Sequence, residues 1–407
     1  MAIRIITAPS TIAKGLNGSV MNNRQKSKFI LAGGVLLVAG LALSACSTGA
    51  AATAPAISAA VKLDPSALEP KGIVGVGRHD EKPALVDTLK LSDADKAKVK
   101  AGNFKVGIVM QTMGIDWSTL TVQGIQDTLK DLGIEVVGVT DAKFNVQTQI
   151  SDIENMISKK PDLIISIPTD DVATAQAYKK VAAAGIKLVF IHMPPAGLTY
   201  PKDYQSVIAP DNQGNGQVAA EALSAYIPKN GVAGIVDYGV DFFTTNQRTL
   251  RVNEWFKQNR PDVKLKTVTF TDTNAVGPVA ANFITANPDV KGLFVIWDSP
   301  AMQAIASLRQ AGVKIPVTTM DLGNEVAVDM ASGGYIKAIA AQKPYDQGVA
   351  EAMASANALI GNSIPAWVAL PAVAVVPSNI LSSYKAVFHA DPPQALVDAC
   401  NKSKLCG

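Results

Sequence analysis

The chain repeats itself in register at an offset of 127 residues. The matched pairs are Val106-Gly107-Ile108-Val109 with Ala233-Gly234-Ile235-Val236, Pro161-Asp162 with Pro288-Asp289, and Ala184-Gly185-Ile186-Lys187-Leu188 with Ala311-Gly312-Val313-Lys314-Ile315. A solenoid repeat is about 20–50 residues long, whereas this unit has the size of a domain, ~100–150 residues. The repeat therefore predicts two similar lobes with a space between them.

Short apolar runs alternate with segments of helical character from Asn103 onward. The predicted buried strands are Val106–Met110, Val136–Val139, Leu163–Ile167, Leu188–Ile191, Val207–Ala209, Ala233–Val236, Leu265–Phe270, Leu293–Ile296 and Val317–Met320. The predicted helices are Leu120–Leu132, Gln149–Ser158, Ala173–Ala184, Gln217–Ile227, Leu250–Gln258 and Met302–Gln310. Such alternation indicates βαβ units with helices on both faces of a parallel sheet. We expect an α/β fold of two doubly wound parallel-sheet lobes.

Residues 1–45 have the pattern of a targeting segment. A basic stretch precedes Phe29–Leu43, an apolar run of 15 residues. That is short for a helix spanning ~30 Å of hydrocarbon, which takes about 20 residues. Leu43-Ser44-Ala45-Cys46 then resembles the lipobox of bacterial lipoproteins, with an ordinary signal peptide as the alternative. We predict that lipid on Cys46 anchors the protein to the membrane and that residues 46–62 form a flexible tether.

The leader also accounts for the positive charge of the whole chain. Residues 1–45 contain five basic and no acidic residues, and their removal leaves 32 basic and 34 acidic ones, a formal charge of −2. No basic face for nucleic acid is implied.

Cys400 and Cys406 are the only cysteines besides Cys46. In an exported protein, two cysteines so close in sequence suggest a small disulfide loop at the C-terminus, with two free thiols as the alternative. No His or further Cys lies near them, and the whole chain has three His, so we expect no metal centre.

In parallel α/β sheets the ligand lies beyond the carboxyl ends of the strands. This rule narrows the search to the loops that follow the predicted strands. They are Gln111–Ser118, Thr169–Asp170 and His192–Met193 in the first lobe, and Asp237–Thr245, Thr271–Thr273, Trp297–Asp298 and Met320–Asp321 in the second.

Several segments share their order and spacing with a known family. They are Lys105-Val106-Gly107-Ile108-Val109, Pro161 to Asp170, Ile208-Ala209-Pro210-Asp211-Asn212, Ala286-Asn287-Pro288-Asp289-Val290 and Gln342-Lys343-Pro344. Together they resemble the ribose- and galactose-type periplasmic solute-binding proteins of sugar ABC transporters, over roughly Asn103 to Asn379. Sugar-responsive repressors have similar folds but would need a DNA-binding headpiece, where this chain has a lipobox leader.

The resemblance implies a type I periplasmic-binding-protein fold with three crossovers, which we place near Ala209-Pro210, Gln342 and Ala372. The predicted segments are an N-terminal lobe (103–209 plus 343–371), a C-terminal lobe (210–342 plus 372–380), a surface extension (63–102) and a C-terminal tail (381–407). The resemblance also implies a monomer without a cofactor. The protein would close on a small carbohydrate or polyol and deliver this ligand to the permease subunits of an ABC transporter.

The candidate ligand-binding residues are Gln111, Trp117, Ser118, His192, Arg251, Thr271, Trp297, Asp298, Asp321 and Gln342. Carboxylate, amide and guanidinium groups bind sugar hydroxyls through hydrogen bonds worth about 1.5–3 kcal/mol each where a charge takes part, and aromatic rings cover the C–H face of the sugar.

Each kind of candidate has an alternative interpretation. Arg251 lines up with the family's ligand arginine, and Arg248, one helical turn earlier, is the competing choice. Core packing would also explain Trp117 and His192. Trp297 is equally compatible with loop packing, and Asp321 with a helix cap.

Two departures from the family pattern bear on the ligand. His192-Met193 stands where the family usually has Asp-Arg, and Trp297 replaces an amide. Fewer charges and an added aromatic ring make a less polar pocket. We therefore expect a sugar alcohol, a deoxysugar or another less common carbohydrate rather than ribose.

Two other functions are compatible with parts of the sequence. Gly214-Asn215-Gly216-Gln217-Val218-Ala219, with Asp237 about twenty residues later, has the outline of a dinucleotide-binding fingerprint and hence of an enzyme. Asp211-Asn212 before it is also a plausible helix cap, which favours a structural role for the motif. A sensor that presents its sugar-bound form to a receptor is the second alternative.

Overall fold

A computed structural model describes residues 61–407. The predicted leader, the predicted lipidation site Cys46 and almost all of the predicted tether lie outside the described residues. None of the helices within residues 61–407 has the length and apolar character needed to cross a membrane.

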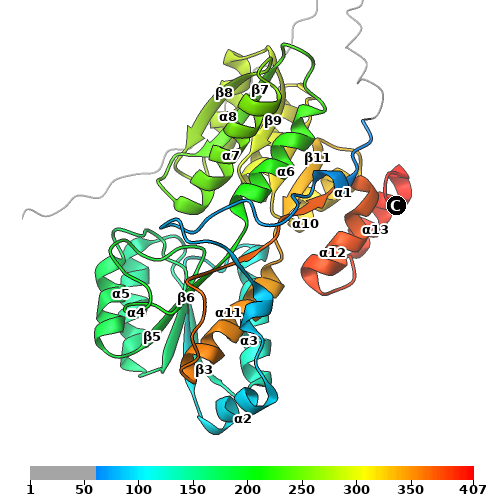
Figure 1. Ribbon diagram of the computed structural model, residues 1–407. Coiled ribbons are helices and arrows are strands. Elements are labelled where there is room, and N and C mark those ends of the chain that lie inside the picture. Colours follow the sequence, from blue (N-terminus) through cyan, green and yellow to red (C-terminus); the bar gives the residue numbers. More distant parts are fainter. Residues whose placement is uncertain (1–60) are drawn as a thin grey trace, which may run out of the picture. The chain divides into compact units, whose positions relative to one another are not determined.

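The first sheet has seven strands, all paired in parallel (Figure 1). In spatial order they are β1 (Ala84–Leu85), β12 (Trp367–Leu370), β6 (Ser206–Pro210), β5 (Lys187–Ile191), β4 (Leu163–Ser166), β2 (Lys105–Met110) and β3 (Glu135–Asp141). Side chains of β4 and β5 alternate between two apolar clusters, one on each face of the sheet. This double burial explains why these strands read as continuous apolar runs in the sequence.

The second sheet repeats the order of the first. Its strands are β13 (Val373–Val375), β11 (Ile336–Ala341), β10 (Val317–Met320), β9 (Val290–Val295), β7 (Val232–Tyr238) and β8 (Lys264–Phe270). β7 to β11 occupy the positions that β2 to β6 occupy in the first sheet, and only β13 runs antiparallel to its neighbour. The α/β fold of two similar doubly wound lobes is thereby confirmed, and each of the nine predicted strands is present.

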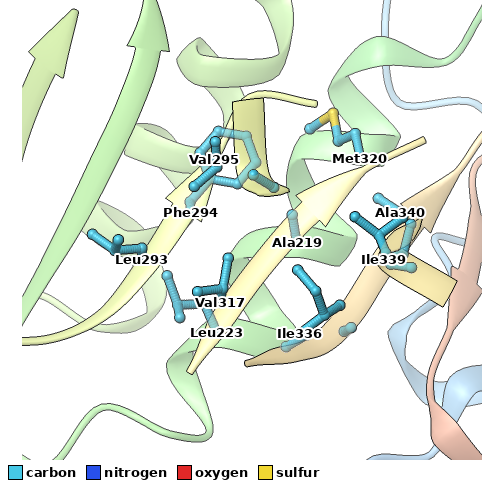
Figure 2. Close-up of a cluster of buried hydrophobic side chains, with 14 of the residues drawn as sticks. Ala219, Leu223, Leu293, Phe294, Val295, Val317, Met320, Ile336, Ile339 and Ala340 are labelled. Atoms are coloured by element: carbon cyan, nitrogen blue, oxygen red, sulfur yellow. The ribbon is translucent and has the colours of Figure 1, made fainter. Parts of the chain in front are cut away.

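Helices cover both faces of the first sheet and pack around the second (Figure 1). The helices are α1 (Pro65–Leu68), α2 (Asp93–Ala101), α3 (Asp116–Asp131), α4 (Val146–Ser158), α5 (Ala175–Ala183), α6 (Asn212–Ser224), α7 (Phe243–Asn259), α8 (Val276–Ala286), α9 (Asp298–Gln310), α10 (Asn324–Ala331), α11 (Pro344–Leu359), α12 (Ile380–Phe388) and α13 (Gln394–Ser403). Figure 2 shows the core of the second lobe, where α6 packs on β9, β10 and β11.

The chain passes between the two sheets three times within residues 206–375. It leaves the first sheet after β6 and enters α6 of the second lobe, returns between β11 and α11, and leaves again between β12 and β13. These passages lie at the positions expected from the sequence. They form the three-crossover hinge that joins the lobes.

Residues 63–102 differ from the expected surface extension. Leu68 of α1 is buried in the core of the second lobe, whereas Leu89, Leu91 and Val99 are buried in that of the first. Strand β1 extends the first sheet beside β12. The sequence analysis missed these buried residues because the segment lies outside the 127-residue repeat that guided the strand assignment.

We call residues 61–91 the N-terminal strap, since they run from one lobe to the other. At the hinge, the carboxylate of Asp211 accepts the backbone N–H groups of Val74 at 2.6 Å and Gly75 at 2.9 Å. The same carboxylate caps α6 by accepting the N–H of Gly214 at 2.8 Å, as the capping interpretation predicted. The chain runs through the strap from Leu68 in the core of the second lobe to Leu89 in the core of the first. The strap is therefore a fourth passage of the chain between the lobes.

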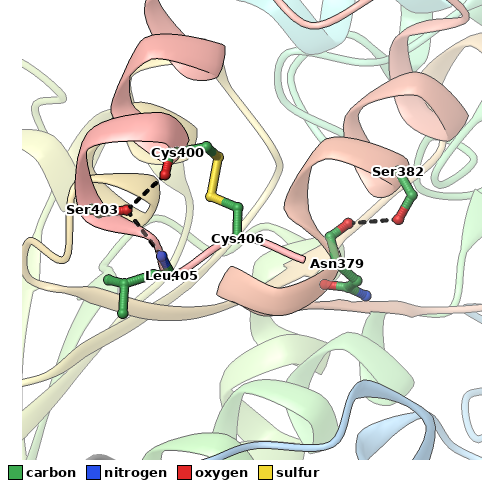
Figure 3. Close-up of a disulfide and its surroundings, with 6 residues drawn as sticks. All are labelled: Asn379, Ser382, Cys400, Ser403, Leu405 and Cys406. Carbon is green, nitrogen blue, oxygen red and sulfur yellow. Dashed lines mark hydrogen bonds between the residues drawn. A yellow bond between two sulfur atoms is a disulfide. The ribbon is translucent and has the colours of Figure 1, made fainter.

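The C-terminal segment 381–407 is packed rather than loose. Tyr384, Val387, Leu396 and Cys400 are buried in the core of the second lobe. Cys400 and Cys406 form a disulfide with an S–S distance of 2.00 Å, which closes the turn after α13 (Figure 3).

Helices α3 and α11 cross at two glycines in the first lobe. A Cβ on Gly348 would lie 2.1 Å from the carbonyl oxygen of Thr121, and one on Gly124 would lie 2.2 Å from that of Tyr345. Neither backbone oxygen can move without separating the helices. α11 begins directly after the second hinge passage, so this close crossing holds the hinge segment against the lobe.

We predict that Gly348→Ala lowers the free energy of unfolding by about 1–3 kcal/mol, the usual effect of overpacking a tight contact. Gly277→Ala is the matched control, because its Cβ would meet its nearest atom at an ordinary 3.4 Å in helix α8. That variant should change stability by less than about 1 kcal/mol. Urea denaturation of both variants checks the prediction, and equal midpoints would contradict it.

Candidate ligand-binding site

A cavity of about 270 Å³ lies between the two lobes. Its lining residues lie at or directly after the carboxyl ends of strands, from β2 to β5 in the first lobe and from β7 to β11 in the second. They are Gln111, Ile115, Trp117, Phe144, Thr169, His192, Tyr238, Val240, Phe242, Thr244, Thr245, Arg248, Thr273, Asn274, Trp297, Ser299, Gln303, Asp321 and Gln342. The volume is at the small end for ligand pockets, which are usually ~300–1,000 Å³.

Six of the ten candidate residues line this cavity: Gln111, Trp117, His192, Trp297, Asp321 and Gln342. The other four do not. Ser118 of α3 is fully buried. Thr271 is exposed, whereas Thr273, two residues later, lines the cavity. Asp298 lies beside the cavity, where it lines two neighbouring pockets with Asp116 and Gly323.

The arginine of the site is Arg248 rather than Arg251. Arg251 points toward α6, where it donates to Gln217 at 2.6 Å. Arg248 is 3% exposed and lines the cavity; its Nε donates to Asn212 at 3.1 Å and its Nη1 to the carbonyl oxygen of Ile296 at 3.3 Å. The two arginines are three residues apart on α7, and sequence spacing alone could not tell which one turns inward.

Asp321 balances the charge of Arg248. Its Oδ2 accepts from Nη1 of Arg248 at 3.4 Å, and its Oδ1 accepts from the amide of Gln342 at the hinge. Because the guanidinium already has a carboxylate, an amide and a carbonyl as partners, the pair adds little net charge to the cavity.

His192 and Asp321 occupy equivalent places in the two lobes. Each follows the strand next to the hinge strand, and each has a left-handed backbone, with φ of 67° and 65°. The N–H of His192 donates to Ile208 of β6 at 2.8 Å, and that of Asp321 donates to Ala340 of β11 at 3.2 Å. This conformation, uncommon for non-glycine residues, turns both side chains away from the strand direction at the cavity.

His192 is uncharged. Burial, and next the charge of Arg248, lower the pKa of His192 to about 3. Its ring packs against Trp117 with centroids 4.8 Å apart. The first lobe therefore contributes a neutral imidazole and an indole to the cavity, in agreement with the less charged pocket expected from His192-Met193.

Aromatic rings of the second lobe form the opposite wall. Tyr238 and Trp297 line the cavity with centroids 5.3 Å apart, and buried Phe270 packs behind both at 5.5 Å. Phe242 and the half-exposed Phe144 add further rings. Tyr238 and Phe242 fall within the predicted loop Asp237–Thr245, but nothing in their spacing singled them out. Phe144 follows β3, whose loop was not among those searched.

Five lining residues carry a buried polar atom without a hydrogen-bond partner: Trp117 Nε1, Thr169 Oγ1, His192 Nε2, Thr244 Oγ1 and Gln342 Oε1. Buried polar groups are normally paired, so such a concentration at one cavity indicates groups that find partners when a ligand is present. All five belong to uncharged side chains at neutral pH.

Three carboxylates meet at the edge of the cavity. Asp116 of α3 reaches across to the second lobe, where its Oδ2 accepts from the Nδ2 of Asn324 at 2.9 Å and from the backbone N–H at 3.3 Å. Burial, then the charges of Asp321 and Asp116, raise the pKa of Asp298 to about 8. Asp298 is therefore protonated at neutral pH.

The glycines of the dinucleotide-like motif have a packing role. A Cβ on Gly216 would lie 2.5 Å from the carbonyl oxygen of Arg248 in α7, and one on Gly214 would lie 2.4 Å from the Asp211 carboxylate. Both glycines lie inside α6, which packs against α7. The motif is thus explained by helix packing and capping rather than by an approach to phosphate.

A family model described as a periplasmic binding protein domain matches residues 106–363. Among curated proteins, the ribose import binding protein of Bacillus subtilis is 23% identical over 268 residues, which cover 66% of this chain and 86% of that protein.

Two solved structures have a similar fold. An ABC transporter solute binding protein from Agrobacterium vitis, bound with alpha-D-tagatopyranose, has a TM-score of 0.65 and 23% identity and covers 71% of this chain and 99% of its own. One from Mycobacterium smegmatis with bound glycerol has a TM-score of 0.62 and 20% identity, with coverages of 69% and 96%.

The raised pKa of Asp298 predicts how the stability of the folded protein depends on pH. The folded protein holds a proton on this carboxyl that the unfolded chain, with a pKa of 3.8, releases at lower pH. Since the folded state binds more protons between about pH 4 and about pH 8, the Asp298 contribution to stability is full below this range and is lost as the pH rises through it.

Asp298→Asn keeps the shape of the side chain but has no group that titrates in this range. The substitution should therefore remove this contribution to the pH dependence of stability. We expect the melting temperature of the variant, relative to that of the wild type, to increase as the pH rises from about 5 to about 8. Thermal unfolding of both proteins across this range measures the difference. Curves that stay parallel would show that Asp298 is ionised in the folded protein.

Proposed function

The chain belongs to the periplasmic binding protein family, and we propose that it captures a small neutral sugar or polyol in the cavity between its lobes. Its relatives are sugar-binding transport proteins rather than enzymes. The observation that carries the proposal is the ring of unpartnered, uncharged polar atoms around a cavity bounded by aromatic side chains. Hydroxyl groups would satisfy the polar atoms, and C–H faces would cover the rings.

The balance of polar and aromatic groups supports a neutral ligand other than ribose. The charge of Arg248 is matched inside the protein by Asp321, His192 is neutral, and Asp298 is protonated. The second lobe presents Tyr238, Phe242 and Trp297. A deoxysugar or a related carbohydrate with an apolar edge, or a sugar alcohol, which has no anomeric hydroxyl to pair with a charged group, suits such a site better than ribose.

Capture proceeds by a population shift between open and closed lobes. A ligand that touches both walls gains its full contact energy only when the lobes are together, so it stabilises that state. The hydrogen bonds between Asp116 and Asn324 connect α3 of the first lobe to α10 of the second and would form on closing. No bond of the ligand is made or broken.

Delivery to an ABC permease follows from the same closed state, because a permease would recognise the pair of lobes in their ligand-bound arrangement. Removal of residues 1–45 and lipidation of Cys46 would hold the protein on the outer face of the cytoplasmic membrane. The tether, residues 46–62, leads directly into the N-terminal strap and hence to the hinge. Presentation of the closed form to a receptor is the second candidate function, and neighbouring permease and ATPase genes would favour transport.

A thermal-shift screen with pentoses, hexoses, polyols and deoxysugars tests ligand capture, since a ligand of the folded state raises the melting temperature. We expect at least one polyol or deoxysugar to give a larger shift than ribose. Calorimetry should then rank the hits by affinity. Ribose binding more tightly than every polyol and deoxysugar would refute the preference, and no shift with any of them would refute the proposed function.

Two variants test whether the ligand binds in the cavity. Trp297→Ala removes part of the aromatic wall, and Asp321→Asn removes the charge that Arg248 and Gln342 contact while keeping the shape of the side chain. Each should abolish the shift given by the best hit and leave a cooperative melting transition. Leu250→Ala, an exposed residue of α7 outside the cavity, is the control and should respond like the wild type.

A further inference from the structure

Helix α12 begins the C-terminal segment and lies where the two lobes meet. Tyr384 and Val387 of this helix are buried in the core of the second lobe. Val387 also lines a small pocket together with Leu120 and Pro344 of the first lobe. The segment follows the residues that the family model matches, which end at residue 363. Helix α12 thus brings side chains from outside the matched domain to the boundary between the lobes.

Three side chains in line connect α12 to the first lobe. The hydroxyl of Tyr384 donates to Oδ1 of Asn324 at 2.8 Å. The Nδ2 of Asn324 donates to Oδ2 of Asp116 at 2.9 Å, and the backbone N–H of Asn324 donates to the same oxygen at 3.3 Å. Tyr384 and Asn324 belong to the second lobe, whereas Asp116 begins α3 of the first. The last link of the line therefore crosses from one lobe to the other.

The donors and acceptors of this line have only one consistent arrangement. A carboxylate accepts hydrogen bonds and donates none, so the NH₂ group of Asn324 must face Asp116. The amide oxygen then faces Tyr384, whose hydroxyl must donate. Asn324 is also the first residue of α10, where the backbone N–H groups at the helix N-terminus favour a negative charge. The side chain and the backbone of Asn324 are thus both directed toward the carboxylate of Asp116.

Tyr384 itself is held in place. Its ring is 6% exposed and stacks on Phe388, with centroids 4.1 Å apart and planes at 4°. Helix α13, which the disulfide between Cys400 and Cys406 follows, packs against α10 (Figure 1). Groups that are fixed before an interaction forms lose less entropy when it forms. A hydroxyl held in this way prepares the amide of Asn324 to receive Asp116.

A second contact of α12 with the first lobe is more exposed. The Nε2 of His389 lies 2.7 Å from Oδ1 of Asp346 in α11. The two side chains are 44% and 35% exposed, and solvent-exposed pairs of this kind contribute little. The line through Asn324 is therefore the contact of α12 that matters most when the lobes come together.

We propose that Tyr384 is a positioning residue for closure of the lobes. It holds the amide of Asn324 in the orientation that binds Asp116, and it thereby stabilises the closed state. This assignment rests on the proposed function. Tyr384 is not among the residues that line the cavity, so it acts through the closing equilibrium and not through contact with the ligand. The C-terminal segment then raises the affinity for every ligand by the same factor.

Closure is measured without a ligand by crosslinking the two lobes. Phe144→Cys and Asn274→Cys place thiols after the outermost strands β3 and β8, on opposite walls of the cavity. Cys400 and Cys406 are paired with each other, and Cys46→Ser removes the remaining thiol. A short bis-maleimide then joins the lobes at a rate that increases with the closed fraction.

We expect Tyr384→Phe to slow this crosslinking about three- to tenfold, the effect of losing one typical hydrogen bond. Asp116→Ala should slow it as well. Tyr384→Phe should have no further effect in the Asp116→Ala protein, because the amide then has no carboxylate to meet. Tyr335→Phe is the matched control, since this tyrosine of the second lobe faces Arg309 and lines no part of the cavity, and it should crosslink like the wild type.

Equal rates for the wild type and Tyr384→Phe, or losses that add up in the double variant, would overturn the assignment. The phenylalanine keeps the stacking on Phe388, so we expect the variant to fold. A merely structural tyrosine would lower the melting temperature and leave the crosslinking rate unchanged. A wild type that does not crosslink at all would contradict closure itself, and with it both the assignment and the proposed function.

The hits of the sugar screen provide a second readout. Apparent affinity falls by the same factor as the fraction of the binding-competent state. Tyr384→Phe should therefore weaken every hit equally, by the factor by which crosslinking slows. Trp297→Ala changes the cavity wall and should weaken different sugars to different degrees. Losses in Tyr384→Phe that vary from sugar to sugar would contradict an action through closure alone.

Discussion

Parallel strands connected through helices all end at one edge of their sheet, and this constraint decides where the chemistry of the protein can lie. β2 to β5 bring Gln111, Trp117, Thr169 and His192 to one edge, and β7 to β11 bring the aromatic wall, Arg248 and Asp321 to another. Duplication of the unit makes the two edges similar, and three hinge passages turn them toward each other. A ligand site between them follows from the topology before any side chain is chosen.

Asp211 connects this topology to the N-terminal strap. It lies at the first hinge passage, where one carboxylate caps α6 and holds the backbone at Val74 and Gly75. The strap then continues into the first lobe, where Arg78 pairs with Asp171 and β1 joins β12. Opening of the lobes must therefore move a segment that binds both of them, and the predicted membrane tether enters the fold through the same segment.

The repeat and the apolar runs were sufficient to predict the fold, because parallel strands buried on both faces leave continuous hydrophobic stretches in the sequence. The same reasoning directed the search to strand ends and named six of the residues that line the cavity: Gln111, Trp117, His192, Trp297, Asp321 and Gln342. It could not choose Arg248 over Arg251, since the inward side of α7 depends on how the helix packs against α6. It also missed the strap, which has no counterpart in the repeat, and helix α11, which was not among the predicted helices.

The distribution of charge in the site explains why a neutral ligand fits it. Arg248 and Asp321 neutralise each other and also engage Asn212, Ile296 and Gln342, so their charges order the walls instead of remaining free for a ligand. Burial, and next the charge of Arg248, keeps His192 uncharged, and burial together with the nearby carboxylates keeps a proton on Asp298. What remains at the surface of the cavity is a set of dipoles with fixed directions beside aromatic rings. Selectivity in such a site depends on which ligand atoms donate and which accept.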